Sequence, residues 1–244
     1  MPKSLSARVY IALIIGSGFL LVGDAVLNAP SLPAARFMVL MGLAVVAARL
    51  RVKLPGLTGT MSVNLPFILL AVALTATAEA LILGFISTFA QCLPDDKRKV
   101  KIVQLAFNCC AITLAVGAAR WIYVSPEIAS HVAAPALRLA LAAAGYFLAN
   151  TLLITLVISL TESVSVVRTG TEMFQLSFLY MLASAGVAGL SLLVGQESAW
   201  QVPLALLPIM LGVYLSYRRF FSTTAAEPAV RTMEASGAPA EVRI

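Results

Sequence analysis

The sequence is poor in charged residues, histidine and cysteine, and each shortage excludes a class of protein. Charged residues make up 11% of the 244 positions and hydrophobic residues 60%, and the mean hydropathy is +0.95. Soluble domains are about a quarter charged, so a soluble globular protein is excluded. His131 is the one histidine, and Cys92, Cys109 and Cys110 do not have the spacing of metal ligands. We therefore expect neither a metal site nor a cofactor.

Catalytic motifs are also missing. The sequence has no glycine-rich phosphate loop after a strand, no HExxH motif, and no nucleophile paired with a base. We therefore expect no enzymatic activity. The net charge of +6 comes from basic residues in short loops beside apolar runs. That pattern is typical of membrane topology, so we predict no nucleic-acid partner.

Long apolar runs fill most of the chain and predict an all-α fold. We expect a polytopic transmembrane bundle of about eight helices, one of them short, over residues 1–221. The polar, Pro-containing residues 222–244 are predicted to form a disordered cytoplasmic tail. The predicted spans cover residues 8–28, 35–50, 63–75, 77–93, 101–124, 135–160, 174–195 and 200–221.

The third predicted span is unusual because it is short and follows a segment rich in glycine, proline, serine and threonine. Residues 63–75 form an apolar helix of about 20 Å, whereas the hydrocarbon core of a membrane is about 30 Å thick. The sequence therefore predicts either a short buried span or a re-entrant one. The polar breaks that follow are PDDKRKVK at 94–101, the loop at 125–134 and TESVSVVRTGTE at 161–172.

The basic residues predict the orientation in the membrane. If residues 63–75 cross the membrane, fourteen basic residues lie on the side of the N-terminus and three on the other. This bias favours a bacterial inner-membrane protein with both termini in the cytoplasm. The three exceptions are Arg36, Arg120 and Arg138, and the fourteen are Lys3, Arg8, Arg49, Arg51, Lys53, Lys97, Arg98, Lys99, Lys101, Arg168, Arg218, Arg219, Arg231 and Arg243.

A few polar side chains lie within the apolar segments, where they must face protein, water or each other. Two pairs lie four residues apart, so each pair shares one helix face. These side chains either bind a ligand or join helices and cap their ends, and Glu79, like Asp24, is also placed to reach interfacial water. The candidate ligand-binding residues are Asn64, Glu79, Gln91, Gln104, Asn108, Tyr146 and Asn150.

Two segments resemble a known family. They are LPGLTGTMSVNLPFILLAVALTATAEALILGFISTFAQCL at 54–93 and KIVQLAFNCCAITLAVGAA at 101–119. Together they resemble the membrane input region that precedes diguanylate cyclase (GGDEF) or HD-type phosphodiesterase domains in bacterial signalling proteins. The resemblance implies a region that senses a small or lipophilic signal. In that family an output domain follows, whereas here a polar tail follows Arg219.

The short helices and the polar loop are also similar to the substrate-capture subunits of energy-coupling-factor transporters, which have about six spans. The expected function is therefore a membrane sensor or ligand-binding module that recognises a small or lipophilic molecule within the bundle. The alternative is a transport protein or a substrate-capture subunit. Either function implies membrane lipids, a small-molecule ligand and a cytoplasmic signalling or transport partner as its partners.

Overall fold

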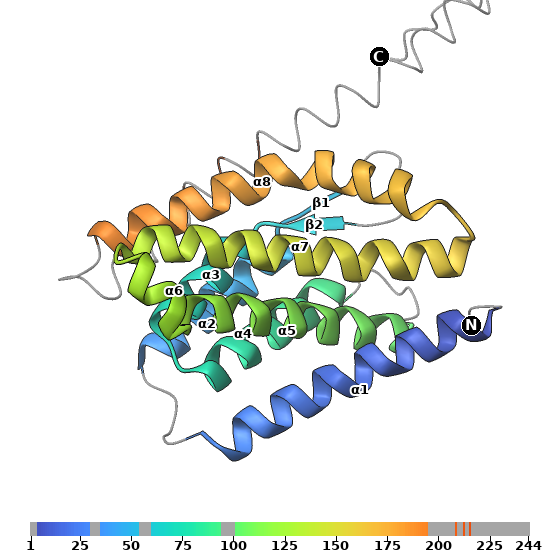
Figure 1. The fold of residues 1–244 in the computed structure, drawn as a ribbon, viewed down its shortest axis with the longest axis horizontal. Coiled ribbons are helices and arrows are strands. Elements are labelled where there is room, and N and C mark those ends of the chain that lie inside the picture. The colour runs from blue at the N-terminus through green and yellow to red at the C-terminus, as the bar shows by residue number, and fades with distance from the viewer. Residues whose placement is uncertain are drawn as a thin grey trace, which may run out of the picture.

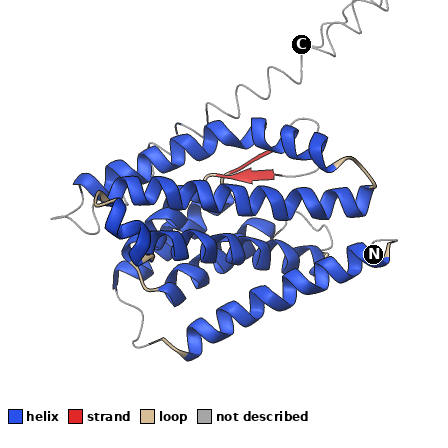
Figure 2. Ribbon diagram, in the orientation of Figure 1, coloured by secondary structure: helices blue, strands red, loops and turns tan. Residues whose placement is uncertain are grey.

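The computed structural model describes residues 4–29, 35–53, 60–93 and 101–194, and the single positions Pro208, Gly212 and Leu215. This part of the chain is almost entirely helical, which confirms the predicted all-helical class (Figure 2). The eighth predicted span, 200–221, and the predicted tail, 222–244, lie outside the described residues, apart from the three single positions.

A helix lies at each of the first seven predicted spans, and a short extra helix, α6, lies in the loop at 125–134. Pro126 begins α6, where a missing N–H costs nothing. The helices are α1 Leu5–Leu27, α2 Ala35–Arg49, α3 Leu65–Leu74, α4 Thr77–Cys92, α5 Ile102–Val124, α6 Pro126–His131, α7 Pro135–Glu162 and α8 Val166–Val194 (Figure 1).

Three helices in the described part of the chain, α1, α5 and α7, are long and apolar enough to cross a membrane. The bent helix α8 makes a fourth if its parts Val166–Gln175 and Ser177–Leu193, which meet at 45°, form one span. Helix α3 has 10 residues, so it extends only about 15 Å at about 1.5 Å per residue. The short third span predicted from the sequence is therefore shorter still.

Two three-residue strands interrupt the helical pattern, and the sequence did not predict them. Strand β1, Arg51–Lys53, pairs antiparallel with β2, Thr60–Ser62, in a register that places Arg51 opposite Ser62. The pair lies between the end of α2 and the start of α3, within the Gly- and Pro-rich segment. A strand of three residues is too short to show the alternation of polar and apolar residues that indicates a strand.

Successive long segments run in opposite directions, which brings several basic residues to one end of the bundle. We call this the basic end, and Arg8, Arg49, Arg51 and Lys101 lie there. The Ser4 hydroxyl at the start of α1 donates to the Leu160 carbonyl near the end of α7. In Figure 1 the N-terminus accordingly lies at the same end as the connection from α7 to α8. The opposite end holds the end of α5 and the start of α7.

Helix α8 begins eight residues before the predicted span at 174, so most of the predicted polar break at 161–172 is helical. The break itself is short because Ser163 adopts a left-handed conformation, with φ 57° and ψ 36°, and ends α7. Arg168 and Glu172 form an ion pair at 3.0 Å on the exposed side of the first turns. Such a pair one turn apart supports a helix despite its polar residues.

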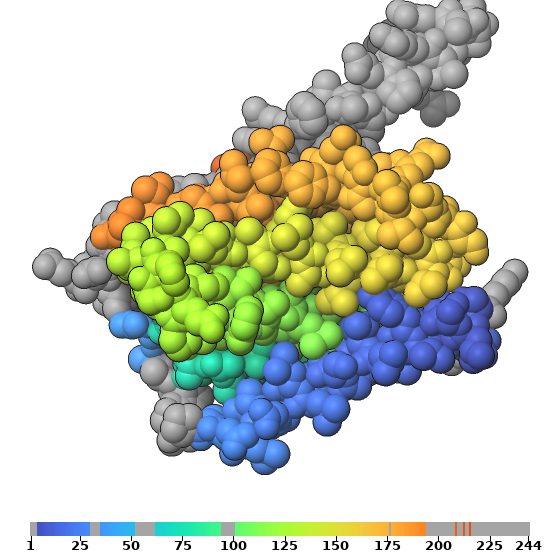
Figure 3. Space-filling view, in the orientation of Figure 1, coloured from blue at the N-terminus to red at the C-terminus, as the bar shows by residue number. Residues whose placement is uncertain are grey.

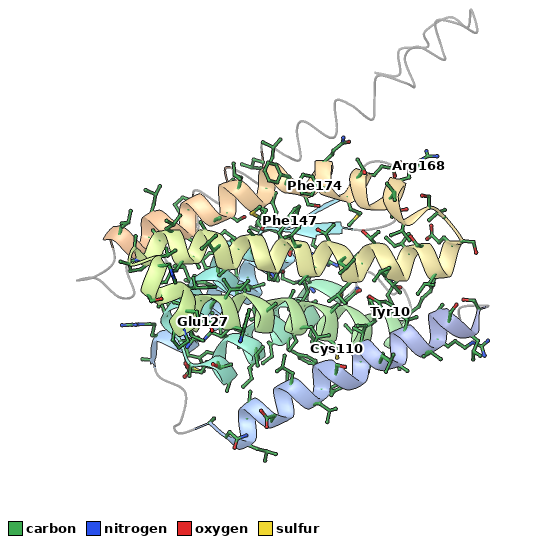
Figure 4. All side chains as sticks on the ribbon, viewed as in Figure 1. Tyr10, Cys110, Glu127, Phe147, Arg168 and Phe174 are labelled. Atoms are coloured by element: carbon green, nitrogen blue, oxygen red, sulfur yellow. The ribbon has the colours of Figure 1, made fainter. Side chains whose placement is uncertain are left out.

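Helix α5 packs against α1, α4 and α7, and glycines let its neighbours approach it closely. A Cβ atom at Gly18 of α1 would lie 2.4 Å from Cys110 Cβ, and one at Gly84 of α4 would lie 2.9 Å from Val116. Small residues at such contacts are typical of helices that pack within a membrane. Figure 4 shows α1 passing Cys110 of α5 along one edge of the bundle, and Figure 3 shows α1 as a ridge on that edge.

The core surrounds α3, and apolar side chains cover much of the outside. All eight residues from Leu65 to Val72 are buried, as expected of a helix that is hydrophobic on every side. Outside, Leu27 is 87% exposed, Val167 78% and Leu152 56%. Apolar side chains that are exposed on the long helices are typical of a surface that faces lipid and not water.

Candidate functional site

A cluster of neutral polar side chains lies inside the bundle at the start of α3. The Ser62 hydroxyl lies 2.8 Å from the Asn64 side-chain oxygen and 2.8 Å from the Gln91 side-chain oxygen. The Asn64 amide nitrogen donates to the Ser87 hydroxyl at 3.3 Å. Ser62, Asn64 and Ser87 are buried. We call these four residues, Ser62, Asn64, Ser87 and Gln91, the polar cluster.

The polar cluster lies where a helix begins inside apolar surroundings, and the N–H groups of its first turn all have partners. The Tyr180 hydroxyl of α8 accepts the Leu65 N–H at 3.2 Å. Pro66 has no N–H to satisfy, and the N–H groups of Phe67 and Ile68 donate to the Asn64 carbonyl. The start of α3 therefore needs no water and no bound anion to satisfy its backbone.

Arginine side chains donate hydrogen bonds to backbone carbonyls at the C-terminal ends of α3 and α4. Arg120 of α5 donates to the Val72 carbonyl in the last turn of α3 and to the Thr77 hydroxyl at 3.4 Å. Arg49 donates to the Ala90 carbonyl at the end of α4, and Arg51 to the carbonyl of Gln91. Positive side chains stabilise the carbonyl end of a helix, so these arginines hold the α3–α4 hairpin at both of its ends.

Two tyrosines and two groups without partners lie on the helices beside the polar cluster. Tyr146 of α7 and Tyr180 of α8 are both buried, and these two helices pack against each other. Asn150 is one turn from Tyr146, and its buried side-chain oxygen has no hydrogen-bond partner in the described part of the chain. The same holds for the hydroxyl of Ser184, one turn from Tyr180 and 0% exposed. Buried polar groups normally have a partner, and the described chain supplies none for these two.

Comparison with protein-family models, curated proteins and solved structures finds no match for this chain. The geometry alone therefore carries the functional argument.

The seven candidate residues do not converge on one site. Asn64 and Gln91 belong to the polar cluster, and Tyr146 and Asn150 lie one turn apart on α7. Glu79 instead accepts the Ala76 N–H at 3.0 Å and caps the start of α4. The Asn108 amide donates to Cys92 Sγ at 3.5 Å, and Gln104 is exposed in the first turn of α5. In the described chain, Gln104 and Asn108 form no hydrogen bond with the cluster, and Glu79 lies at the opposite end of α4 from Gln91.

Two members of the polar cluster, Ser62 and Ser87, were not among the candidates. Both have a signal in the sequence: Ser62 lies two residues before Asn64, and Ser87 lies four residues before Gln91 and so shares its helix face. Tyr180 and Ser184 likewise lie one turn apart on α8. A serine is too common in apolar helices for the sequence alone to single it out, because its hydroxyl often bonds to its own helix.

Proposed function

We propose that this chain is an integral protein of the bacterial inner membrane with both termini in the cytoplasm. The exposed apolar side chains of the long helices support a lipid environment, and the alternating helix directions support the topology. That alternation gathers Arg8, Arg49, Arg51 and Lys101 at one end, as the positive-inside rule requires of a cytoplasmic face. The α3–α4 hairpin supports counting the short helix α3 as one membrane crossing, because α3 and α4 run in opposite directions.

Within that membrane setting, we propose that the protein binds a small neutral molecule at the polar cluster and acts as a sensor or ligand-binding module. The observation that carries the proposal is a set of neutral hydrogen-bonding groups at a helix start inside an apolar bundle. The four residues of the cluster are themselves uncharged, and Arg51 lies beside them and donates to the Gln91 carbonyl. A ligand with hydroxyl, amide or carbonyl groups can therefore exchange hydrogen bonds with it, leaving no charge unpaired.

The neighbouring helices add to this argument. Ser184 and Asn150 hold unused hydrogen-bonding groups on α8 and α7, close to Tyr180 and Tyr146. A ligand between these helices and the polar cluster would gain partners that the described chain does not supply. It would also change the contact between Tyr180 and the start of α3. A shift of α3 would displace Gln91 of α4, and with it Arg51, which donates to the Gln91 carbonyl at the basic end. This connection gives a route for signalling to a cytoplasmic partner.

The experiment is mass spectrometry of the protein purified gently in a mild detergent, to identify a small molecule that remains bound. Tyr180→Phe removes the hydroxyl at the start of α3 and is expected to lower the amount of bound molecule. Tyr10→Phe is the matched control, because the Tyr10 hydroxyl also bonds to the backbone: it donates to the Leu153 carbonyl at 3.1 Å, in another part of the bundle. Equal retention in both variants would refute the proposal.

Transport is the second candidate, and one observation favours it. The α2–α4 region is a discontinuous membrane segment whose second helix begins inside the bundle, as helices at the binding sites of many transporters do. A substrate-capture subunit would show the same feature. Once the bound molecule is identified, uptake by proteoliposomes separates the two functions. Accumulation of the labelled molecule, alone or with an added energy-coupling partner, favours transport, and binding with no uptake favours sensing.

A further inference from the structure

Arg138 lies in the first turn of α7, at the end of the bundle opposite the basic end. Its guanidinium carbon is 5.3 Å from the centre of the Tyr123 ring of α5. The side chain is half-buried. A cation above an aromatic face is attracted to it and held in place, so α5 and α7 together fix the position of this guanidinium.

The guanidinium has no hydrogen bond in the described part of the chain, and its Nε atom is buried. A guanidinium carries five N–H donors, and an aromatic ring interacts with its charge without accepting those donors in ordinary hydrogen bonds. Glu127 of α6 is exposed at the same end of the bundle. It forms no ion pair with Arg138 in the described residues, although it lies in the loop that leads to α7.

Arg120 provides an internal comparison. It lies in the last turn of α5, also at this end, and its donors are used by the Val72 carbonyl and the Thr77 hydroxyl. Capping α3 therefore explains Arg120. Arg138 caps no helix in the described chain, and its contact with Tyr123 uses the charge of the guanidinium but none of its N–H donors. Basic residues are scarce at this end, and a buried N–H without a partner is costly.

We propose that Arg138, held over Tyr123, is the anchor of an anion-binding site at this end of the bundle. The planar fork of an arginine matches a carboxylate or phosphate group, to which it can donate two parallel hydrogen bonds. The anion is either a small dissolved molecule or the headgroup of an acidic lipid. This site is separate from the polar cluster and does not depend on the function proposed for it.

The test uses the full-length protein in nanodiscs of phosphatidylcholine, titrated with inorganic phosphate or acetate against chloride at equal ionic strength. A second set of nanodiscs contains phosphatidylglycerol as the lipid source of phosphate. Binding is followed as the rise in melting temperature. Arg138→Gln is expected to weaken binding of whichever of these anions binds the unmodified protein by about tenfold or more, because a charge-assisted bidentate contact is lost.

Arg36→Gln is the matched control, since Arg36 is exposed at the start of α2 and its replacement changes the net charge equally. It is expected to bind as the unmodified protein does. A response to phosphate or acetate identifies a dissolved anion, and a response to phosphatidylglycerol alone identifies a lipid headgroup. If Arg138→Gln does not fold, Tyr123→Leu tests the same site and should also weaken binding. The proposal is overturned if no anion raises the melting temperature, or if the Arg138 or Tyr123 variant responds as fully as Arg36→Gln.

Discussion

The contact between α1 and α5 depends on the absence of a side chain at Gly18. In a Gly18→Ala variant, the new Cβ would lie 2.4 Å from Cys110 Cβ and 2.8 Å from Cys110 Cα, where ordinary contacts begin at 3.4 Å. The helices must therefore separate by about 1 Å, since a Cβ and a Cα cannot rotate away. Separation would also loosen the ring contacts of Tyr10 with Phe107 and of Phe19 with Phe85.

Overpacking of this kind typically costs about 1–3 kcal/mol of unfolding free energy. Gly16→Ala is the matched control in the same helix, because nothing lies within 4 Å of the added Cβ. Replacing a helical glycine with alanine there is expected to stabilise the protein by about 0.5–1 kcal/mol. Gly18→Ala gains the same stabilisation, so the two alanine variants should differ by about the overpacking cost itself, about 1–3 kcal/mol.

The assay is reversible unfolding in mixed micelles of mild detergent and sodium dodecyl sulfate, followed by circular dichroism. A double-mutant cycle sharpens it: Cys110→Gly removes the Cβ that lies nearest to the new side chain but leaves the Cα in place. It should therefore recover part of the loss in Gly18→Ala. Equal unfolding free energies for Gly18→Ala and Gly16→Ala would show that α1 does not pack on α5 through Gly18.

Three further predictions concern other contacts. Gly145→Ala should destabilise less than Gly18→Ala, because its Cβ would meet only the flexible Cδ1 tip of Ile122, at 2.2 Å. Adding Ile122→Val should restore the unfolding free energy in the same assay. If it does not, the contact is contradicted. Arg120→Gln should increase hydrogen exchange at the end of α3, since the charged cap of the helix is lost. Arg36 is exposed at the same end of the bundle, so Arg36→Gln should leave the exchange of α3 unchanged. Equal exchange in the two variants would contradict the cap. Reporter fusions in the loop at 94–101 should report the cytoplasm, and an external location would overturn the proposed topology.

The helix positions could be predicted from the sequence because most apolar runs are bounded by proline, glycine or charge. The segment LPFILLAVAL is apolar throughout, and in the structure α3 is buried on every side. Where a run has polar residues, the prediction was less exact: the start of α8 was placed at 174 because Arg168 and Glu172 suggested a loop. Their ion pair shows that residue type alone does not separate a loop from the exposed turns of a helix.

The candidate site was only partly predictable, because polar residues identify themselves in an apolar sequence but their partners do not. Asn64 and Gln91 stood out as amides, and they share the Ser62 hydroxyl. Glu79 and Asn108 stood out equally, yet Glu79 caps its own helix and Asn108 bonds to Cys92. Which polar residues meet depends on contacts between distant segments, such as that of the Tyr180 hydroxyl with the Leu65 N–H. The periodicity of polar residues within one helix does not predict such contacts.

That last contact has a consequence for how the protein is made. The partner of the Leu65 N–H lies 115 residues further along the chain. At about 5–20 residues per second, the ribosome needs roughly 6 to 23 s to reach Tyr180 after Leu65 has been made. During this interval the Leu65 N–H must have another partner, such as water. The hydrogen bond at the start of the shortest hydrophobic helix can therefore form only after the chain has been made as far as α8.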